Sequence, residues 1–128
     1  VNFKLYMSDI GMLTLCSKTP LQTILSPIEV DNIFIGAMTE NYVAQVFTNK
    51  GYELFYWQSE GKAEVDFILQ KEDVVIPVEV KKGERNRSKS LGIFAKKYNS
   101  PYAIRISKKN FGLENNIKSV PLYSAFCI

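Results

Sequence analysis

Residues 64–81 read EVDFILQKEDVVIPVEVK, and the alternation of apolar and polar positions in this stretch decides the fold. Side chains alternate between the two faces of a β-strand. Residues 64–69 and 74–81 therefore predict two strands of a hairpin, joined by a turn over residues 70–73 with Lys71 and Glu72 at its centre. The cross-strand pairs expected from this turn are Leu69 with Val74, Asp66 with Pro77, and Glu64 with Glu79.

This register sorts the hairpin into an apolar and a polar face. The apolar face is expected to hold Val65, Phe67, Leu69, Val74, Ile76, Val78 and Val80. The other face is expected to hold Asp66, Glu79 and Lys81, with Glu64 beside them. A slip by one residue would bury charge in the core, so the hydrophobic pattern favours this sorting.

Two carboxylates and an ammonium on one face suit the binding of a divalent metal ion against a phosphodiester. Asp66 and Glu79 would repel each other unless a cation or a shared proton relieved them. Lys81 can itself be that cation, and the group would then be an ordinary surface ion-pair cluster. The pattern leaves both interpretations open.

Length and composition indicate one domain of ordinary make-up. The chain has 128 residues, of which 46% are hydrophobic and 23% charged, which is enough for a core of its own. It contains no apolar run near the ~20 residues that a membrane-spanning helix needs. Val1 is not an initiator methionine and no secretory signal is visible, so we expect the chain to begin inside a longer protein.

Cysteine and histidine usage narrows the chemistry. Cys16 and Cys127 lack CxxC spacing, so we expect them to be reduced core residues of a cytoplasmic protein and not zinc ligands. The chain has no histidine, which excludes Ser-His-Asp and Cys-His catalysis within it. A metal ion would need oxygen ligands, which favours Mg²⁺, Mn²⁺ or Ca²⁺. A glycine-rich phosphate loop is absent as well.

Positive charge gathers after the second strand of the hairpin. The net charge is only +3, but the basic positions of this region are Lys81, Lys82, Arg85, Arg87 and Lys89. Such a cluster beside a candidate metal site suits a polyanion such as nucleic acid. A solvated loop leading into a helix explains the same residues equally well.

The rest of the chain predicts further helices and strands around the hairpin. The expected elements are a strand over 3–9, a helix over 10–15 capped by Ser8 or Asp9, a linker over 18–27, a helix from 33 to about 50 closed by Gly51, a strand over 52–57, a helix over 88–98, a strand over 101–107 and an apolar tail over 120–128. The strand after the crossover helix should join the sheet in parallel. We expect an α/β fold, with residues 1–30 as an N-terminal extension of a core formed by 31–128.

Glu40 stands in the middle of the apolar stripe of the helix expected from residue 33. The stripe consists of Ile33, Gly36, Ala37, Val43, Ala44 and Phe47. An unpaired buried carboxylate costs several kcal/mol, so Glu40 needs a partner. That partner is either a basic side chain or the metal ion expected at Asp66 and Glu79.

The order helix, three strands, helix, strand, with Glu40, Asp66 and Glu79-Val80-Lys81, resembles the PD-(D/E)XK nuclease superfamily. The resemblance implies a mixed sheet flanked by helices with a restriction-endonuclease-like αβββαβ core. It implies that Asp66, Glu79 and Glu40 bind Mg²⁺ or Mn²⁺, and that Lys81 positions or activates the attacking water. The Val80 carbonyl is a further expected oxygen ligand.

The whole chain is more closely similar to a C-terminal domain of unknown function that follows an AAA-type ATP-binding domain in many bacterial and archaeal proteins. The matching stretches are residues 4–13, 39–43, 56–57, 64–67, 78–81, 89–91 and 117–123. This resemblance implies an ATP-binding domain in the same protein as a partner. Two positions depart from the patterns: Val65 replaces the usual Pro before Asp66, and Gln58 replaces an Arg, which weakens a phosphate contact there.

We therefore expect a metal-dependent phosphodiesterase that acts on DNA or RNA. Lys82, Arg85, Arg87 and Lys89 would hold phosphates without reading sequence, and Glu64 would support the metal ligands from the same face. The alternatives are a catalytically silent nuclease fold that serves the ATPase as a nucleic-acid-binding or protein-interaction module, and a purely structural domain.

Overall fold

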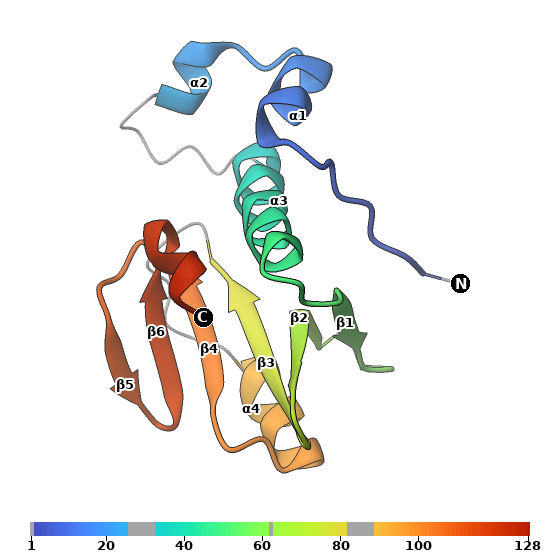
Figure 1. The fold of residues 1–128 in the computed structure, drawn as a ribbon, viewed down its shortest axis with the longest axis vertical. Helices are drawn as coiled ribbons and strands as arrows, with labels where there is room; N and C mark the ends of the chain where they lie inside the picture. The colour runs from blue at the N-terminus through green and yellow to red at the C-terminus, as the bar shows by residue number, and fades with distance from the viewer. Residues whose placement is uncertain (1, 26–32, 62, 82–88) are drawn as a thin grey trace.

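The computed structural model describes residues 2–25, 33–61, 63–81 and 89–128 (Figure 1). The helices are α1 (Ile10–Ser17), α2 (Leu21–Leu25), α3 (Ile33–Asn49), α4 (Lys89–Tyr98) and the 3₁₀ helix η1 (Leu122–Cys127). The strands are β1 (Phe55–Gln58), β2 (Glu64–Lys71), β3 (Val74–Val80), β4 (Ala103–Ser107), β5 (Gly112–Glu114) and β6 (Ile117–Pro121). Among these residues no helix is long and apolar enough to cross a membrane.

The described strands form one mixed sheet of six strands in the order β1-β2-β3-β4-β6-β5. β1, β2 and β3 are an antiparallel meander, and β4 returns beside β3 in parallel after α4. β6 is parallel to β4, and β5 closes the edge as an antiparallel partner of β6. The predicted α/β class, the mixed sheet and the parallel strand after the crossover helix are confirmed.

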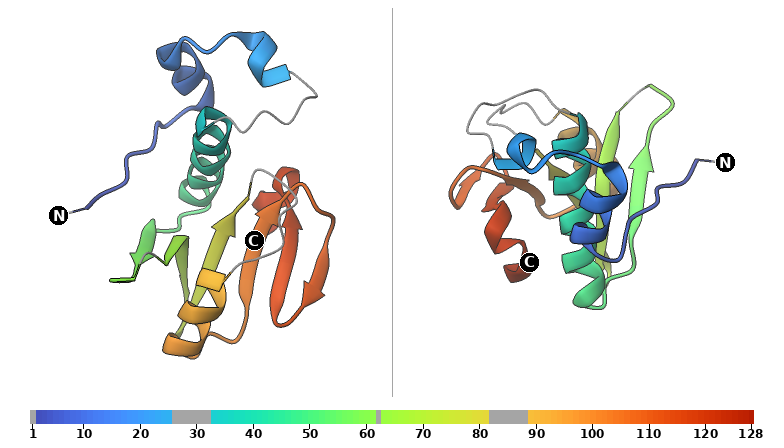
Figure 2. Two further views of the ribbon diagram at one scale, coloured as in Figure 1. Left: turned by 180° about the vertical axis from the view of Figure 1, so that it is seen from behind. Right: turned by 90° about the horizontal axis from the view of Figure 1, so that it is seen from above.

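Helices cover both faces of the sheet, and each face has its own apolar core (Figure 2). On one face α3 and η1 cover a cluster that includes Phe47, whose ring meets that of Phe67 edge-on at 5.5 Å between centroids. On the other face α4 covers a smaller cluster in which Trp57 meets Phe94 edge-on at 5.4 Å. α1 and α2 lie beyond the sheet, beside the N-terminal end of α3 (Figure 1).

The β2–β3 hairpin has a tighter turn than the sequence predicted. Lys71 pairs with Val74, and Leu69 pairs with Ile76 instead of Val74. The two-residue loop is Glu72-Asp73, and Glu72 takes the left-handed conformation with φ 51°. The predicted pairs were wrong by two residues, because a shift of two preserves the alternation of faces, so the apolar pattern cannot detect it.

A β-bulge in β2 changes which face Asp66 occupies. Phe55 pairs with Ile68 and Trp57 with Val65, so two steps along β1 match three steps along β2. The extra residue on β2 marks a bulge. Val65 consequently packs in the cluster under α4, and the prediction that it shares a face with Phe67 was wrong. Asp66 instead points to the α3 face, where Glu64 also lies.

Several local predictions hold at the helices. α3 begins at Ile33 and ends at Asn49, and it is closed by Gly51 at φ 84°, a conformation in which glycine has no steric cost. Asp9 caps α1 through a hydrogen bond that its Oδ1 accepts from the Met12 amide at 2.9 Å. The first turns of α3 extend past the sheet, so Ile33 is 88% exposed and not part of the predicted buried stripe.

Other predictions were wrong in part. Residues 2–7 run extended but join no β-ladder, and the linker contains α2. The apolar tail contributes to β6 and η1, and its Val120 and Ala125 pack in the core under α3. The β5–β6 hairpin has a two-residue turn at Asn115 and Asn116, both with positive φ. It was not predicted because β5 is exposed and shows no apolar alternation. Cys16 and Cys127 are free but exposed, not buried in the core.

Candidate functional site

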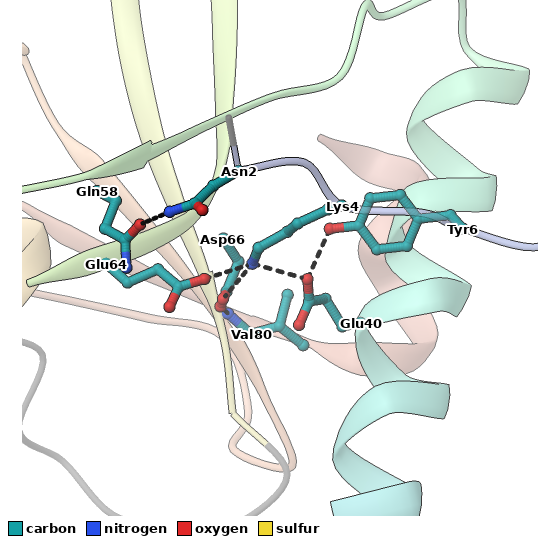
Figure 3. Close-up of polar contacts among 8 residues, drawn as sticks. All are labelled: Asn2, Lys4, Tyr6, Glu40, Gln58, Glu64, Asp66 and Val80. Carbon is teal, nitrogen blue, oxygen red and sulfur yellow. Dashed lines mark hydrogen bonds and ion pairs between the residues drawn. The ribbon is translucent and has the colours of Figure 1, made fainter. Parts of the chain in front are cut away.

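A lysine from the N-terminal segment lies among carboxylates from two other elements (Figure 3). Among the residues that the structure describes, three carboxylates lie within ion-pair distance of the Lys4 ammonium. The Lys4 Nζ atom is 2.7 Å from Glu64 Oε1, 3.0 Å from Glu40 Oε1 and 3.6 Å from Asp66 Oδ1. We refer to Lys4, Glu40, Glu64 and Asp66 as the carboxylate cluster.

Each member of the carboxylate cluster is fixed by its element. The bulge turns Asp66 toward α3, and its Oδ2 atom accepts a hydrogen bond from the Val80 amide of β3 at 2.8 Å. Glu40 projects from the middle of α3 and accepts a hydrogen bond of 2.6 Å from the Tyr6 hydroxyl. The Lys4 ammonium also lies 5.5 Å from the centre of the Tyr56 ring on β1.

The carboxylate cluster has more acidic groups than basic ones. Burial raises the pKa of Asp66 to about 6, and the charges of Glu40 and Glu79 act in the same direction, against the lowering effects of the Val80 amide and Lys4. Burial lowers the pKa of Lys4, but its bonds to Glu64 and Glu40 outweigh this and raise that pKa above its ordinary value. One ammonium thus only partly offsets the repulsion among these carboxylates.

A second polar group lies at the end of β3. Val78 and Val80 pack toward α3, so by strand alternation Glu79 points to the opposite face, and Lys81 follows the last residue of β3. Glu79 is 6% exposed, and its Oε1 atom lies 2.9 Å from the Lys81 ammonium. Its Oε2 atom is buried without a hydrogen-bond partner among the described residues. Arg105 of β4, 8% exposed, is the cross-strand neighbour of Glu79.

The chain matches the family described as Domain of unknown function (DUF4143) over residues 35–125. It belongs to the DUF4143 family. No significant match was found among curated proteins or among solved structures. The match to the DUF4143 domain includes α3 from Ile35 onward and the whole described sheet, and with them Glu40, Asp66, Glu79 and Lys81. Lys4 lies outside the matched range.

The DUF4143 domain brings some of the predicted site residues together and separates others. Glu40, Glu64 and Asp66 meet at Lys4, whereas Glu79 and Lys81 form their own ion pair on the other face. The predicted common face of Asp66, Glu79 and Lys81 is therefore not observed, because the bulge reverses Asp66. The charge of Glu79 nevertheless raises the pKa of Asp66, so the two groups remain electrostatically coupled.

The predicted phosphate-binding residues are only partly described. Lys82, Arg85 and Arg87 lie outside the described residues, and Lys89 is exposed at the first position of α4. Gln58, which replaces the expected Arg, accepts a hydrogen bond from the Asn2 side chain at 3.1 Å. The Val80 amide donates a hydrogen bond to Asp66, and the role expected of the Val80 carbonyl stays a prediction.

Sequence reasoning missed Lys4, Tyr6 and Arg105. The alternation in residues 2–7 could have indicated that Lys4 and Tyr6 share one face of the segment. In the structure both point inward, while the apolar Phe3 and Leu5 are 73% and 84% exposed. Arg105 carried a clearer signal. It is the one charged residue in the apolar strand 103–107, and a buried arginine needs anionic partners.

Proposed function

We propose that this DUF4143 domain is a metal-dependent phosphodiesterase with a restriction-endonuclease-like core, acting on nucleic acid as the C-terminal part of an AAA-type ATPase. The observation that carries this proposal is the convergence of Glu40, Glu64 and Asp66, from α3 and β2, on a single cation. The mixed sheet with α3 and α4 on opposite faces supports the proposed core.

The carboxylate cluster fits a divalent metal ion by its donor chemistry. Carboxylate oxygens are the ligands that Mg²⁺ and Mn²⁺ take in proteins. Three such groups lie around one ammonium, and burial together with the charge of Glu40 raises the pKa of Asp66. Among the described residues, no three or more acidic side chains are arranged as they would be around a metal ion. The donors are suitable in kind, and the Lys4 ammonium lies among them in place of a metal ion.

The proposed roles follow from position. Glu40 and Asp66 would hold the metal ion with support from Glu64, and the Val80 carbonyl would be a further oxygen ligand. Glu79 points to the opposite face of β3, so it would act on the site through its charge, which raises the pKa of Asp66, and not as a direct ligand. Bound Mg²⁺ would supply Lewis-acid polarisation of a phosphoryl oxygen and a water of lowered pKa. Lys81 is a compact positive charge beside Glu79 that would orient water or offset developing charge.

Basic residues near β3 would hold the nucleic-acid backbone. Lys89 is exposed at the start of α4 and would contact a neighbouring phosphate. Lys82, Arg85 and Arg87 are proposed for the same role from their place in the sequence alone.

Calorimetric titration with Mn²⁺ tests the proposal without assuming a substrate. We expect wild-type binding near the millimolar range that Asp66→Asn abolishes and Glu79→Gln weakens at least tenfold. Glu114→Gln, on the exposed edge strand β5, is the matched control and should bind as the wild type does. Cleavage of labelled DNA and RNA oligonucleotides with Mg²⁺ or Mn²⁺ follows. Absence of Mn²⁺ binding, both alone and with added oligonucleotide, would refute the metal site.

One observation favours a second candidate, a catalytically silent binding module of the ATPase. Lys4 and Lys81 already pair with the acidic groups that would otherwise hold a metal ion. Nucleic-acid binding that survives EDTA and yields no cleavage under any metal would support this candidate.

A further inference from the structure

We propose that residues 2–7 form a strap that closes the metal site by placing the Lys4 ammonium where the metal ion binds, so that the ion binds only when the strap is released. This inference rests on the proposed function, because it concerns access to the same carboxylates. It assigns a regulatory role to a segment outside the matched range of the DUF4143 family.

The position of the Lys4 ammonium is the first argument. Its nitrogen lies between 2.7 and 3.6 Å from oxygens of Glu40, Glu64 and Asp66, which come from two different elements. A divalent ion at these oxygens would lie within a few ångströms of the ammonium, where two positive charges repel strongly. The ammonium and the metal ion therefore compete for the same donors.

The way the strap is held is the second argument. Residues 2–7 join no β-ladder, although they lie close to β1 and α3 (Figure 3). Their contacts are made largely by side chains: Asn2 to Gln58, Lys4 to the carboxylates, and Tyr6 to Glu40 and to the Phe67 ring. A segment held in this way can open without breaking the sheet, which is the behaviour of locally unfolding units.

The inner end of the strap is fixed by Asn41, which is 3% exposed. Its Oδ1 atom accepts a hydrogen bond from the Met7 amide at 2.7 Å, and its Nδ2 atom donates one to the Met7 carbonyl at 3.0 Å. Asn41 follows Glu40 in α3, so the residue that holds the inner end of the strap is adjacent in sequence to one of the carboxylates. Loosening this attachment should release Lys4 without changing any charge.

The test compares Mn²⁺ affinity at neutral pH, by calorimetry and by the loss of the free-Mn²⁺ electron paramagnetic resonance signal. Lys4→Met should bind Mn²⁺ at least tenfold more tightly than the wild type, which corresponds to a strap open about one tenth of the time or less. Lys4→Arg retains the cation and should bind no more tightly than the wild type.

Two further variants separate gating from a general change of charge. Lys96→Met removes an exposed charge on α4 and should leave the affinity unchanged. Asn41→Ala keeps Lys4 and every carboxylate, and it should tighten binding by several-fold. Its unfolding midpoint is measured alongside. If it does not fold, the Lys4→Met and Lys4→Arg pair still decides the question.

The outcomes distinguish this inference from the proposed function. Equal Mn²⁺ affinity in the wild type and in Lys4→Met, lost in Asp66→Asn, would overturn the strap and leave the metal site standing. Weaker binding in Lys4→Met would also overturn it, because Lys4 would then support the site. Absence of binding in both proteins, with and without oligonucleotide, would overturn the strap and the proposed function together.

Discussion

Replacing Asp66 by Asn should stabilise the domain at neutral pH. The substitution keeps the size of the side chain and an oxygen that can accept the hydrogen bond from the Val80 amide. It removes a negative charge from a place where burial and neighbouring carboxylates penalise it. Functional sites often hold carboxylates where the charge is poorly solvated, so removing such a charge often increases stability.

The size of the effect follows from the pKa of Asp66. Each pKa unit between the folded and unfolded chains corresponds to about 1.4 kcal/mol. The pKa of Asp66 is about 6 in the folded chain against an ordinary value of 3.8, so its ionisation costs the fold about 3 kcal/mol. The ion pair with Lys4, at 3.6 Å, is already included in this cost, because Lys4 lowers the pKa of Asp66. We expect a net increase in the free energy of unfolding of about 1–3 kcal/mol at pH 7.

The sign of the pH dependence is fixed by the same pKa values. The pKa of Asp66 is higher in the folded chain than in the unfolded chain, so the folded chain binds more protons between about pH 4 and pH 6. Below pH 4 the Asp66 carboxyl is protonated and does not destabilise the wild type. As the pH rises through 6 it ionises, and the free energy of unfolding of the wild type falls. The advantage of Asp66→Asn should be near zero at pH 4 and complete above pH 7.

Urea unfolding in EDTA measures this difference. Trp57 is the only tryptophan and packs against Phe94, so its fluorescence reports loss of the core under α4. Midpoints and slopes are compared for the wild type and Asp66→Asn from pH 4 to pH 8. Asp73→Asn, in the exposed β2–β3 turn, is the control with the same chemical change. An Asp66→Asn protein that is less stable than the wild type at pH 7, or equally affected at every pH, would refute the reasoning.

Three further predictions test other parts of the structure. Lys81→Met should keep Mn²⁺ binding and lose cleavage of the oligonucleotides, and unchanged cleavage would exclude the role proposed for this ammonium. Phe67→Ala should lower the free energy of unfolding, measured in urea, by about 3–5 kcal/mol, because Phe67 is 1% exposed in the core under α3. A loss below about 1 kcal/mol would contradict that packing. Asn116→Gly should raise the free energy of unfolding by up to about 1 kcal/mol, because Asn116 has φ 59° in the β5–β6 turn. A loss of stability would contradict the left-handed conformation of this turn.

The sequence predicted the parts of the fold that depend on local periodicity. The α3 helix, the β2–β3 hairpin and the parallel return of β4 each follow from alternation or from helical spacing with a cap. The register of the hairpin does not, because a two-residue shift leaves Phe67 and Leu69 on the same face. The turn decides between such registers, and Glu72 with a positive φ was not a recognisable turn residue.

The candidate site was harder to predict because it depends on contacts between distant residues. The bulge that turns Asp66 toward α3 is visible only in the pairing of β2 with β1. Lys4 meets Glu40 across 36 positions of sequence, and no periodic pattern connects the two. The need of Glu40 for a partner was predicted from its apolar surroundings. That Lys4 is a partner of Glu40 could be found only from the structure.

The carboxylate cluster is difficult to explain as a purely structural feature. A cluster selected for stability would match its charges, since an apolar or neutral replacement is usually at least as stable as a buried ion pair. Here three carboxylates share one partly buried ammonium, and burial and repulsion hold the pKa of Asp66 near 6. The excess negative charge is what a divalent cation would neutralise. If Asp66→Asn stabilises the domain and Lys4→Met tightens Mn²⁺ binding, both effects have one cause, a site that keeps more negative charge than Lys4 can balance.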